Sequence, residues 1–411
     1  MTADSRVFEI ERVGAQGDGV ALVDGDSVFI PFTLQGERVT AVVDGGRGRL
    51  VDVVTPSADR ILPVCRHFGV CGGCALQHME GRAYRDWKTE QVRAAFAARG
   101  LDAEVGELIV PEGGRRRVVL TARRDPDGLH LGFHAAQSHA LVDIIECPVM
   151  APPMLAFLRR GRALLERLVS RRGEARVTLT MSVAGLDVMI AGIEKSLSPQ
   201  LRAAIAEDAA VAGVARVSID GEPVFEALAP FLVFGDVDVP LPPGVFIQAM
   251  AEAEVQMARL VVEGVGKAKR VADLFAGIGA FTFPLAKRAR VLAVDSNREA
   301  IAALSLAVRQ AKGVKPITPL VRDLFREPLS PLELNAYDAV VFDPPRAGAE
   351  AQVRALARSK VATVVAVSCH PATLARDARL LVDGGYKMGA VTPIDQFRYS
   401  PHVEAVSMFR R

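Results

Sequence analysis

Residues 269–286 have the sequence KRVADLFAGIGAFTFPLA, in which an apolar strand, a glycine turn and a helix follow one another. The segments RVLAVDSN, YDAVVFDPPRAG and VATVVAVSCHPATLARDARLL continue this alternation of strand and helix towards the C-terminus. Buried strands joined by crossover helices are typical of a parallel, doubly wound sheet. We therefore expect an α/β fold for residues 246–411.

The glycine turn DLFAGIG, residues 273–279, predicts a nucleotide pocket. Gly277 and Gly279 let the backbone pass close to a ligand, and the following helix presents free N–H groups there. Asp295 ends the next strand, where an acidic residue can hold two ribose hydroxyls. A dinucleotide fold offers the same arrangement, although Thr282 stands where the third glycine of Gly-x-Gly-x-x-Gly would be. The DxFxGxG form is similar to the SAM-binding loop of class I methyltransferases, but a bare glycine turn does not decide between the two.

Asp343 begins the segment DPPR, which follows the apolar strand 339–342. Ligands of such sheets bind beyond the carboxyl ends of the strands, so Asp343 is expected to face the same crevice as Gly277. The prolines stiffen the turn and expose the carboxylate to a planar base. A simple strand-ending turn is the alternative interpretation.

Cys369 ends the apolar stretch 361–368 and comes just before Pro371, which predicts a helix N-terminus at the thiol. A helix N-terminus lowers a thiol pKa because it favours negative charge. A buried core cysteine is the commoner fate of a lone thiol. Its place at the crevice end of a strand favours a reactive thiol.

A reactive thiol would serve methylation of uracil C5, which is a poor nucleophile. Addition of a thiolate to C6 gives an enolate with electron density at C5, which then attacks the methyl group of SAM. A base must afterwards remove the C5 proton, and Glu404 in the terminal segment SPHVE is the candidate. Chemistry alone does not select Glu404 over Asp343 or Asp395.

The residues before 246 predict two further units. Residues 6–54 are short strands broken by glycine turns, as in a small β-barrel. An amphipathic helix over 82–99, a strand meander over 115–145 and an α+β region over 176–240 follow, with one helix near 199–207. We therefore divide the chain into domains at 1–55, 56–245 and 246–411.

Composition indicates a cytoplasmic protein, expected to be a monomer. The N-terminus lacks the apolar region of a secretory signal, and no apolar stretch is long enough to span a membrane. The net charge of +2 does not by itself indicate a nucleic-acid partner. The densest basic cluster is either a phosphate-binding patch or a solvated strand face, and it consists of Arg115, Arg116, Arg117, Arg123 and Arg124.

The chain has five cysteines, and an odd count in a cytosolic protein argues against a disulfide framework. Cys65, Cys71 and Cys74 form a C-x5-C-x2-C pattern, and Cys147 lies far along the chain. Structural zinc sites usually come as two close pairs, whereas three clustered thiols with one remote thiol favour iron–sulfur ligation. Such a site would use four of the five cysteines and leave Cys369 as the only free thiol.

Taken together, these segments resemble the RNA uracil-C5 methyltransferase family, specifically its 23S rRNA branch with an iron–sulfur cluster. The resemblance covers almost the whole chain and includes the β module, CRHFGVCGGCALQH, FIQ, DLFAGIG, DPPRAG, VSCHPATLARD and the terminal HVE. It implies a class I methyltransferase domain, an OB-like TRAM barrel at the N-terminus, and a 4Fe–4S cluster on the four cysteines. A structural or RNA-positioning role is expected for this cluster, because methyl transfer from SAM needs no electrons.

The resemblance also assigns roles to individual residues. Cys369 would be the nucleophile, Glu404 the base, and Asp343 the contact to the target uracil. The arginine cluster would then lie on an RNA-facing sheet. SAM would be held by Gln248, Phe275, Gly277, Gly279, Asp295, Asp323 and Asp343.

Some positions depart from the family pattern, where asparagine is usual. Three single positions have another residue where the family has asparagine: Met250 soon after the FIQ segment, Ala280 after the glycine turn, and His370 after the nucleophile. The segment SLAVRQAKG also stands where the family has an NxxxNG pattern. None of these changes the proposed nucleophile or base, so we expect an active enzyme. A tRNA target, a non-catalytic RNA-binding scaffold and a cytosine-C5 methyltransferase are the alternatives.

Overall fold

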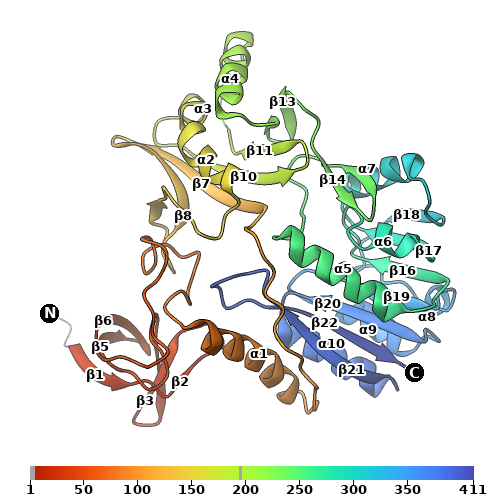
Figure 1. Cartoon of the computed structure of the whole chain (residues 1–411), viewed down its shortest axis with the longest axis horizontal. Helices are drawn as coiled ribbons and strands as arrows, with labels where there is room; N and C mark the ends of the chain where they lie inside the picture. The colour runs from red at the N-terminus through yellow and green to blue at the C-terminus, as the bar shows by residue number, and fades with distance from the viewer. Residues whose placement is uncertain (1–4, 194–196) are drawn as a thin grey trace.

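The computed structural model describes residues 5–193 and 197–411, which form three large sheets and one hairpin (Figure 1). The N-terminal sheet has six strands in the order β1-β5-β6-β4-β3-β2. Alternate side chains point into a small apolar core that includes Phe8, Ile30 and Val39. The short strands expected here are β1 (Ser5–Glu9), β2 (Arg12–Val13), β3 (Gly19–Val23), β4 (Asp26–Ile30), β5 (Arg38–Asp44) and β6 (Arg47–Thr55).

The central sheet has seven strands in the order β13-β12-β11-β10-β7-β8-β9. The predicted meander is confirmed as β7 (Arg117–Asp125), β8 (Gly128–His134) and β9 (Leu141–Asp143). The remaining strands are β10 (Glu174–Ser182), β11 (Gly185–Ala191), β12 (Arg216–Ile219) and β13 (Glu222–Glu226). Their apolar side chains share one core with α2 (Pro152–Arg160), α3 (Arg162–Leu168) and α4 (Pro199–Ala212).

The C-terminal sheet has seven strands in the order β18-β17-β16-β19-β20-β22-β21. Five strands are parallel, as expected: β16 (Arg270–Leu274), β17 (Arg290–Asp295), β18 (Ile317–Val321), β19 (Ala339–Phe342) and β20 (Thr363–Ser368). The predicted parallel arrangement does not extend to one edge of the sheet. There the final hairpin pairs antiparallel with β20, and it consists of β21 (Lys387–Ile394) and β22 (Glu404–Arg410).

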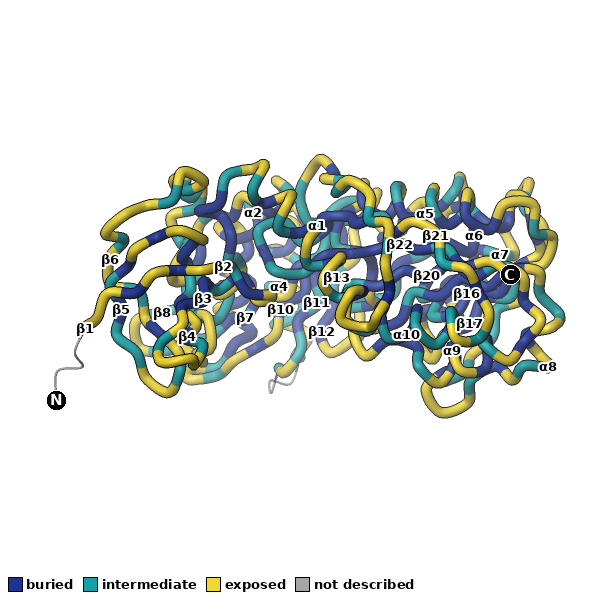
Figure 2. Tube along the Cα trace, turned by 90° about the horizontal axis from the view of Figure 1, so that it is seen from below, coloured by how far each residue is buried: buried dark blue, intermediate teal, exposed yellow. Residues whose placement is uncertain are grey.

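Helices cover both faces of this sheet because successive strand residues alternate between two cores. Val271 belongs to one core and Ala272 to the other. The first face packs against α5 (Ala251–Val265), α6 (Thr282–Ala286) and α7 (Arg298–Gln310). The other carries α8 (Pro331–Leu334), α9 (Glu350–Ala357) and α10 (Pro371–Asp383). Figure 2 shows β16, β20 and β22 buried along most of their length.

Two segments from earlier in the chain also pack on the C-terminal sheet. The hairpin of β14 (Phe231–Phe234) and β15 (Val237–Pro240) joins the core on the α5 face. Helix α1 (Gly81–Ala97) lies beside α10 and β21, where Val92 and Phe96 enter the opposite core (Figure 1). Glu80 caps α1 by accepting backbone N–H groups of its first turn, which fixes where the helix begins. Residues 81–97 therefore link the N-terminal half of the chain to the C-terminal layer.

Candidate active site

The loop between β16 and α6 contains three residues with positive φ: Phe275 (61°), Gly277 (55°) and Gly279 (102°). A Cβ on Gly279 would lie 2.7 Å from the ring of Phe283, so the helix packs this closely only on glycine. A Cβ on Gly277 would meet nothing within 4 Å, which leaves space for a ligand beside it. The N–H of Gly277 donates to Asp295 Oδ2 at 2.9 Å and joins the ends of β16 and β17.

Asp273 is a buried carboxyl group directly behind this loop. Its Oδ2 accepts the hydroxyl of Thr282 at 2.6 Å, which explains a threonine in place of a third glycine. Its Oδ1 has no hydrogen-bond partner within the described residues. Burial raises the pKa of Asp273 to about 7, and the charges of Asp343 and Asp295 add to the rise. A buried oxygen without a partner, just behind the glycine loop, is suited to a ligand group that donates hydrogen bonds.

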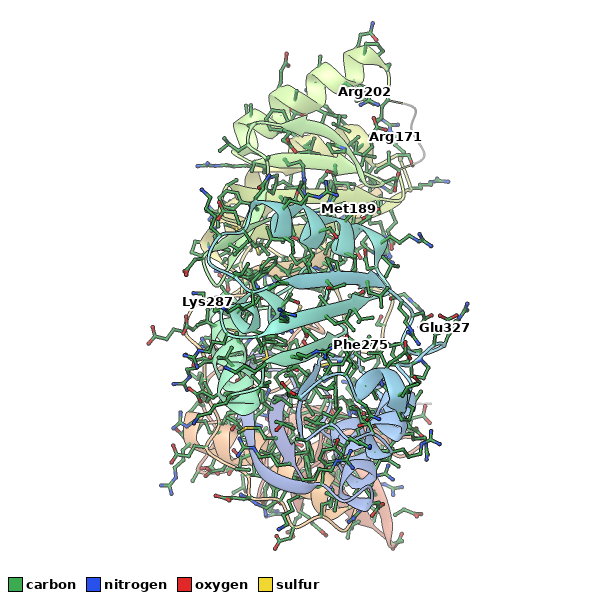
Figure 3. All side chains as sticks on the ribbon, turned by 90° about the vertical axis from the view of Figure 1, so that its right-hand side faces the viewer. Arg171, Met189, Arg202, Phe275, Lys287 and Glu327 are labelled. Carbon is green, nitrogen blue, oxygen red and sulfur yellow. The ribbon has the colours of Figure 1, made fainter. Side chains whose placement is uncertain are left out.

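Asp323 shapes the turn after β18. Its Oδ1 accepts the backbone N–H of Phe325 at 3.0 Å. The ring of Phe325 then lies 5.5 Å from that of Phe275, centroid to centroid. Phe275 lies where the strands of the sheet end, on the side that also carries Glu327 (Figure 3). The two rings can cover one side of a flat ligand at this edge.

Cys369 connects β20 to α10 at the same edge of the sheet and is half-buried. The helix begins at Pro371, as predicted, and His370 caps it: its Nδ1 accepts the N–H of Thr373 at 3.4 Å. The N–H of His370 in turn donates to Ser368 Oγ at 3.2 Å. The thiol is therefore held on a short, internally bonded turn between a buried strand and a helix.

Two glutamine side chains link the candidate acidic residues. Gln248 donates from Nε2 to Asp343 Oδ2 at 2.7 Å, and its Oε1 accepts from Gln396 Nε2 at 2.9 Å. The same Gln396 nitrogen donates to Glu404 Oε2. Gln396 Oε1 accepts the N–H of Ala249 at 3.1 Å, which fixes the orientation of this amide. Asp343 and Glu404, from two different strand ends, are thus joined by one chain of hydrogen bonds.

The pKa values of Cys369, Glu404 and Asp343 are displaced upwards. Burial raises the pKa of Cys369 to about 12, and Glu404 and Asp343 raise it further than Arg346 lowers it. The prediction of a lowered thiol pKa is therefore wrong, because burial and two carboxyl groups outweigh the helix N-terminus. Burial, together with the charge of Asp343, raises the pKa of Glu404 well above its usual value. Burial likewise raises the pKa of Asp343 to about 7.

The structure brings Cys369, Asp343, Glu404 and Gln248 together, and it places the glycine loop on the same side through Asp273. Sequence reasoning missed Gln396, although a glutamine just before the terminal strand was a visible polar signal. It also missed Phe325, which only the turn at Asp323 brings to the loop, and it gave Asp273 no role.

Comparison with known proteins identifies the family of this chain. Residues 240–411 match the model of the tRNA (uracil-5-)-methyltransferase family. An uncharacterized RNA methyltransferase of Brucella suis is 47% identical over 403 residues, covering 98% of this chain and 97% of the relative. The 23S rRNA (uracil(1939)-C(5))-methyltransferase RlmD of Halomonas elongata is 34% identical over 438 residues, covering 98% and 88%. The chain belongs to the RNA uracil-C5 methyltransferase family.

As a member of this family the protein is an RNA uracil-C5 methyltransferase that uses SAM. The structure of Pyrococcus abyssi tRNA (uracil-54, C5)-methyltransferase with S-adenosyl-L-homocysteine matches with a TM-score of 0.77 at 24% identity, covering 98% of this chain and 99% of that one. This likeness confirms the α/β fold of SAM-dependent methyltransferases. Family membership supports a uracil-C5 methyltransferase and not the alternatives of a cytosine-C5 methyltransferase or a non-catalytic scaffold. No helix within the described residues has the length and apolarity to cross a bilayer.

The four remaining cysteines of this methyltransferase line one cavity of about 50 Å³. Burial raises the pKa of Cys147 to about 11, and the three other thiols add to the rise, which confirms that they lie nearby. Gly73 donates its N–H to Cys71 Sγ at 3.4 Å. In residues 5–193 and 197–411, however, no group of three or more His, Cys, Asp or Glu side chains is arranged to hold a metal ion.

The arginine cluster divides into two groups. Three of its members bind partners within the protein: Arg116 to Glu254, Arg123 to Glu174, and Arg124 to the carbonyl of Glu166. Arg115 and Arg117 instead lie over the rings of Phe397 and Phe246, at 5.9 and 5.6 Å. Their Nε atoms have no hydrogen-bond partner in the part of the chain that is described. These two arginines adjoin the segments that carry Gln396 and Gln248.

Proposed function

We propose that this methyltransferase modifies one uridine of 23S rRNA through a covalent bond between Cys369 and uracil C6. The convergence of Cys369, Asp343 and Glu404 at the carboxyl edge of the sheet, beside the glycine loop, carries the proposal. A nucleophile and a proton acceptor in one site are what this chemistry needs.

The reaction begins when Cys369, after its proton has passed to solvent, bonds through Sγ to C6. The electron pair of the C5=C6 double bond moves into an enolate over C5 and O4. Bound SAM supplies a methyl group on a positively charged sulfur; C5 takes the methyl group, and that sulfur keeps the electron pair of the broken bond. Glu404 removes the C5 proton, the C–H electron pair restores C5=C6, and the C6–S bond breaks to return a thiolate.

Glu404 suits the role of base for two reasons. Its Oε1 is buried without a hydrogen-bond partner within the described residues, so this oxygen is available to a proton. Its raised pKa makes it a better proton acceptor than an ordinary carboxylate once ionised. Asp343, at the other end of the glutamine chain, would contact the ring of the uracil.

SAM fits the residues around the glycine loop. Asp295 would bind the ribose hydroxyls, Phe275 would cover the adenine, and Asp323 would hold the turn beside it. The unpartnered Oδ1 of Asp273 would accept hydrogen bonds from the cationic amino group. Gly277 and Gly279 would let the backbone approach the ligand, and Gln248 would lie at the methyl-transfer end.

Two substitutions test the covalent step. Glu404→Gln is expected to trap a protein–RNA adduct that survives denaturing electrophoresis, because the C5 proton stays in place. Cys369→Ala is expected to form no adduct and no 5-methyluridine. An adduct in the Cys369→Ala protein would refute the nucleophile assignment.

The RNA target is inferred from the likeness to RlmD, which extends over 98% of this chain. Mapping 5-methyluridine in rRNA and tRNA from a strain that lacks the protein tests this proposal. Loss of one 5-methyluridine from 23S rRNA would support it, and loss from tRNA alone would favour the alternative of a tRNA enzyme.

We also propose that Cys65, Cys71, Cys74 and Cys147 hold a 4Fe–4S cluster. In a 4Fe–4S cluster each of four thiolates binds a different iron. Four thiols spread around a cavity therefore suit such a cluster better than they suit a single metal ion. The cluster would hold the cysteine loop in shape. Anaerobic purification should give iron and sulfide that are lost in Cys74→Ser and kept in the matched control Cys369→Ser; a colourless protein with stoichiometric zinc would refute the cluster.

The N-terminal and central sheets are proposed to bind RNA, with domains at 1–55 (TRAM-like), 56–245 and 246–411. Arg115 and Arg117 support this role, since their guanidinium groups lie over Phe397 and Phe246 next to the active site, and within the described residues neither has an acidic partner. Deletion of residues 1–55 is expected to weaken RNA binding while SAM binding stays unchanged. Unchanged RNA affinity would refute a role for that sheet in binding.

A further inference from the structure

Residues 395–403, here called the base segment, join β21 to β22 without regular structure and lead directly into Glu404, the first residue of β22. The segment begins at Asp395 and carries Gln396. Because it lacks the hydrogen-bond ladder of a strand, its course depends on contacts with other parts of the chain. Two of the side chains that bind it come from α1, whose residues precede the base segment by about 300 positions.

Lys88 of α1 is fully buried and directs its ammonium group at the base segment. Its Nζ donates to Asp395 Oδ1 at 2.9 Å and to the carbonyl of His402, and it lies 3.5 Å from the carbonyl of Phe397. A lysine has three N–H donors, and here all three meet acceptors of one segment. One side chain thus ties the start of the segment to the residue two positions before Glu404.

Tyr84, one turn earlier on α1, binds the middle of the base segment. Its hydroxyl donates to Asp395 Oδ2 at 2.7 Å and accepts the N–H of Tyr399 at 2.9 Å. The carbonyl of Tyr399 in turn accepts the N–H groups of Ala75 and Leu76 from the cysteine loop, at 2.8 and 3.1 Å. The backbone of Tyr399, which has a positive φ of 62°, is therefore hydrogen-bonded on one side to α1 and on the other to the cysteine loop.

A buried ion pair is a poor choice for stability alone, because apolar residues of similar volume are often as stable or more so. The Lys88–Asp395 pair instead fixes the two ends of a segment that must place a carboxylate within reach of a reacting ring. We propose that Lys88 is a positioning residue that holds Glu404 at the distance required for removal of the C5 proton. The inference rests on the proposed role of Glu404 as the base.

Positioning of the base predicts a particular kinetic defect. Loss of Lys88 should leave formation of the Cys369 adduct nearly unchanged, since Lys88 binds Asp395, Phe397 and His402 and, within the described residues, makes no hydrogen bond to Cys369. The rate of adduct breakdown should fall by about a hundredfold, because a displacement of a catalytic group by about 1 Å has an effect of that size. Here the displaced group is the carboxylate of Glu404. The adduct should therefore accumulate during turnover, with a fall in kcat and little change in KM for RNA.

The test uses Lys88→Met together with Asp395→Asn, because the single change would leave a buried carboxylate unpaired. The matched control is Arg216→Met with Asp187→Asn, which neutralises a buried pair of the central sheet, 2.8 Å apart. Tyr84→Phe, a smaller change on the same segment, is expected to slow adduct breakdown less. Rapid-quench measurement of adduct and product on the full-length protein separates the two steps.

Adduct accumulation in the Lys88 and Tyr84 variants, with none in the control pair, would support the inference. Equal effects in the control pair, or normal adduct breakdown in the Tyr84→Phe protein, would overturn it. If Glu404→Gln itself traps no adduct, the proposed mechanism fails instead, so the two failures are distinguishable.

Discussion

Replacement of Asp273 by asparagine should change how stability depends on pH. Asp273 is 1% exposed, and among the described residues only the hydrogen bond from Thr282 lowers its pKa; burial raises that pKa from 3.8 to about 7. An unfolded chain ionises this group near its ordinary pKa, while the folded chain keeps it protonated until about pH 7. The stability that protonated Asp273 contributes is therefore fully present below pH 3.8 and is lost as the pH rises through the folded-state pKa of about 7.

The size of the loss follows from the displacement of the pKa. About three pKa units correspond to about 4 kcal/mol, of which about 3 kcal/mol fall between pH 5 and the folded-state pKa. The asparagine side chain of the variant keeps an oxygen for the Thr282 hydroxyl and has no charge to bury. Its amide N–H₂ lacks a partner, but that cost is the same at every pH.

Urea unfolding at pH 5 and pH 8.5, without SAM, measures the effect. The stability of Asp273→Asn relative to the parent should rise by about 3 kcal/mol between the two pH values. Thr282→Val is the matched control: it removes the hydrogen bond that favours the ionised form, so the loss of stability should extend to higher pH. A difference between Asp273→Asn and the parent that does not vary with pH would show that Asp273 is not held protonated by the fold.

Three further changes test other parts of the site. Gly279→Ala should cost about 2 kcal/mol of stability and abolish SAM binding, because its Cβ would meet the ring of Phe283 and its φ is 102°; calorimetry with SAM checks this. Arg117→Ala should weaken RNA binding alike for all sequences and lower the salt slope of the affinity by about 1, measured by titration at several salt concentrations. Glu404→Gln should speed alkylation of Cys369 by iodoacetamide at pH 9, because a neighbouring negative charge no longer raises the thiol pKa; an unchanged rate would contradict that electrostatic account.

Local patterns predicted much of the fold. The helix expected over 82–99 is α1 (Gly81–Ala97), and the helix expected near 199–207 continues to Ala212, where Gly213 adopts φ 70°. The antiparallel edge was not predictable, because a buried strand has the same apolar composition in either direction. Cys369 was found because strand, thiol and proline are adjacent in the sequence.

Interactions between distant residues were not predictable. The thiol pKa was misjudged since the helix end is local, whereas Asp343 and Glu404 arrive from other strands. Lys88 resembles an ordinary surface lysine of an amphipathic helix, and its partner lies 307 residues away. The role of Gln396 depends on its hydrogen bond to Gln248, which lies 148 positions earlier in the sequence. In each case the physical cause is tertiary, and no window of sequence contains both partners.

The packing of α1 against the last two strands also affects how the chain is made. More than three quarters of this sequence follows α1, so the ammonium group of Lys88 lacks its partner until Asp395 has been synthesised. Domains that fold as they emerge cannot complete this contact. The side of α1 that carries Val92 and Phe96 therefore lacks its packing partners until the C-terminal strands are made. A nascent protein truncated before the final hairpin would therefore expose the apolar side of α1 to chaperones and proteases.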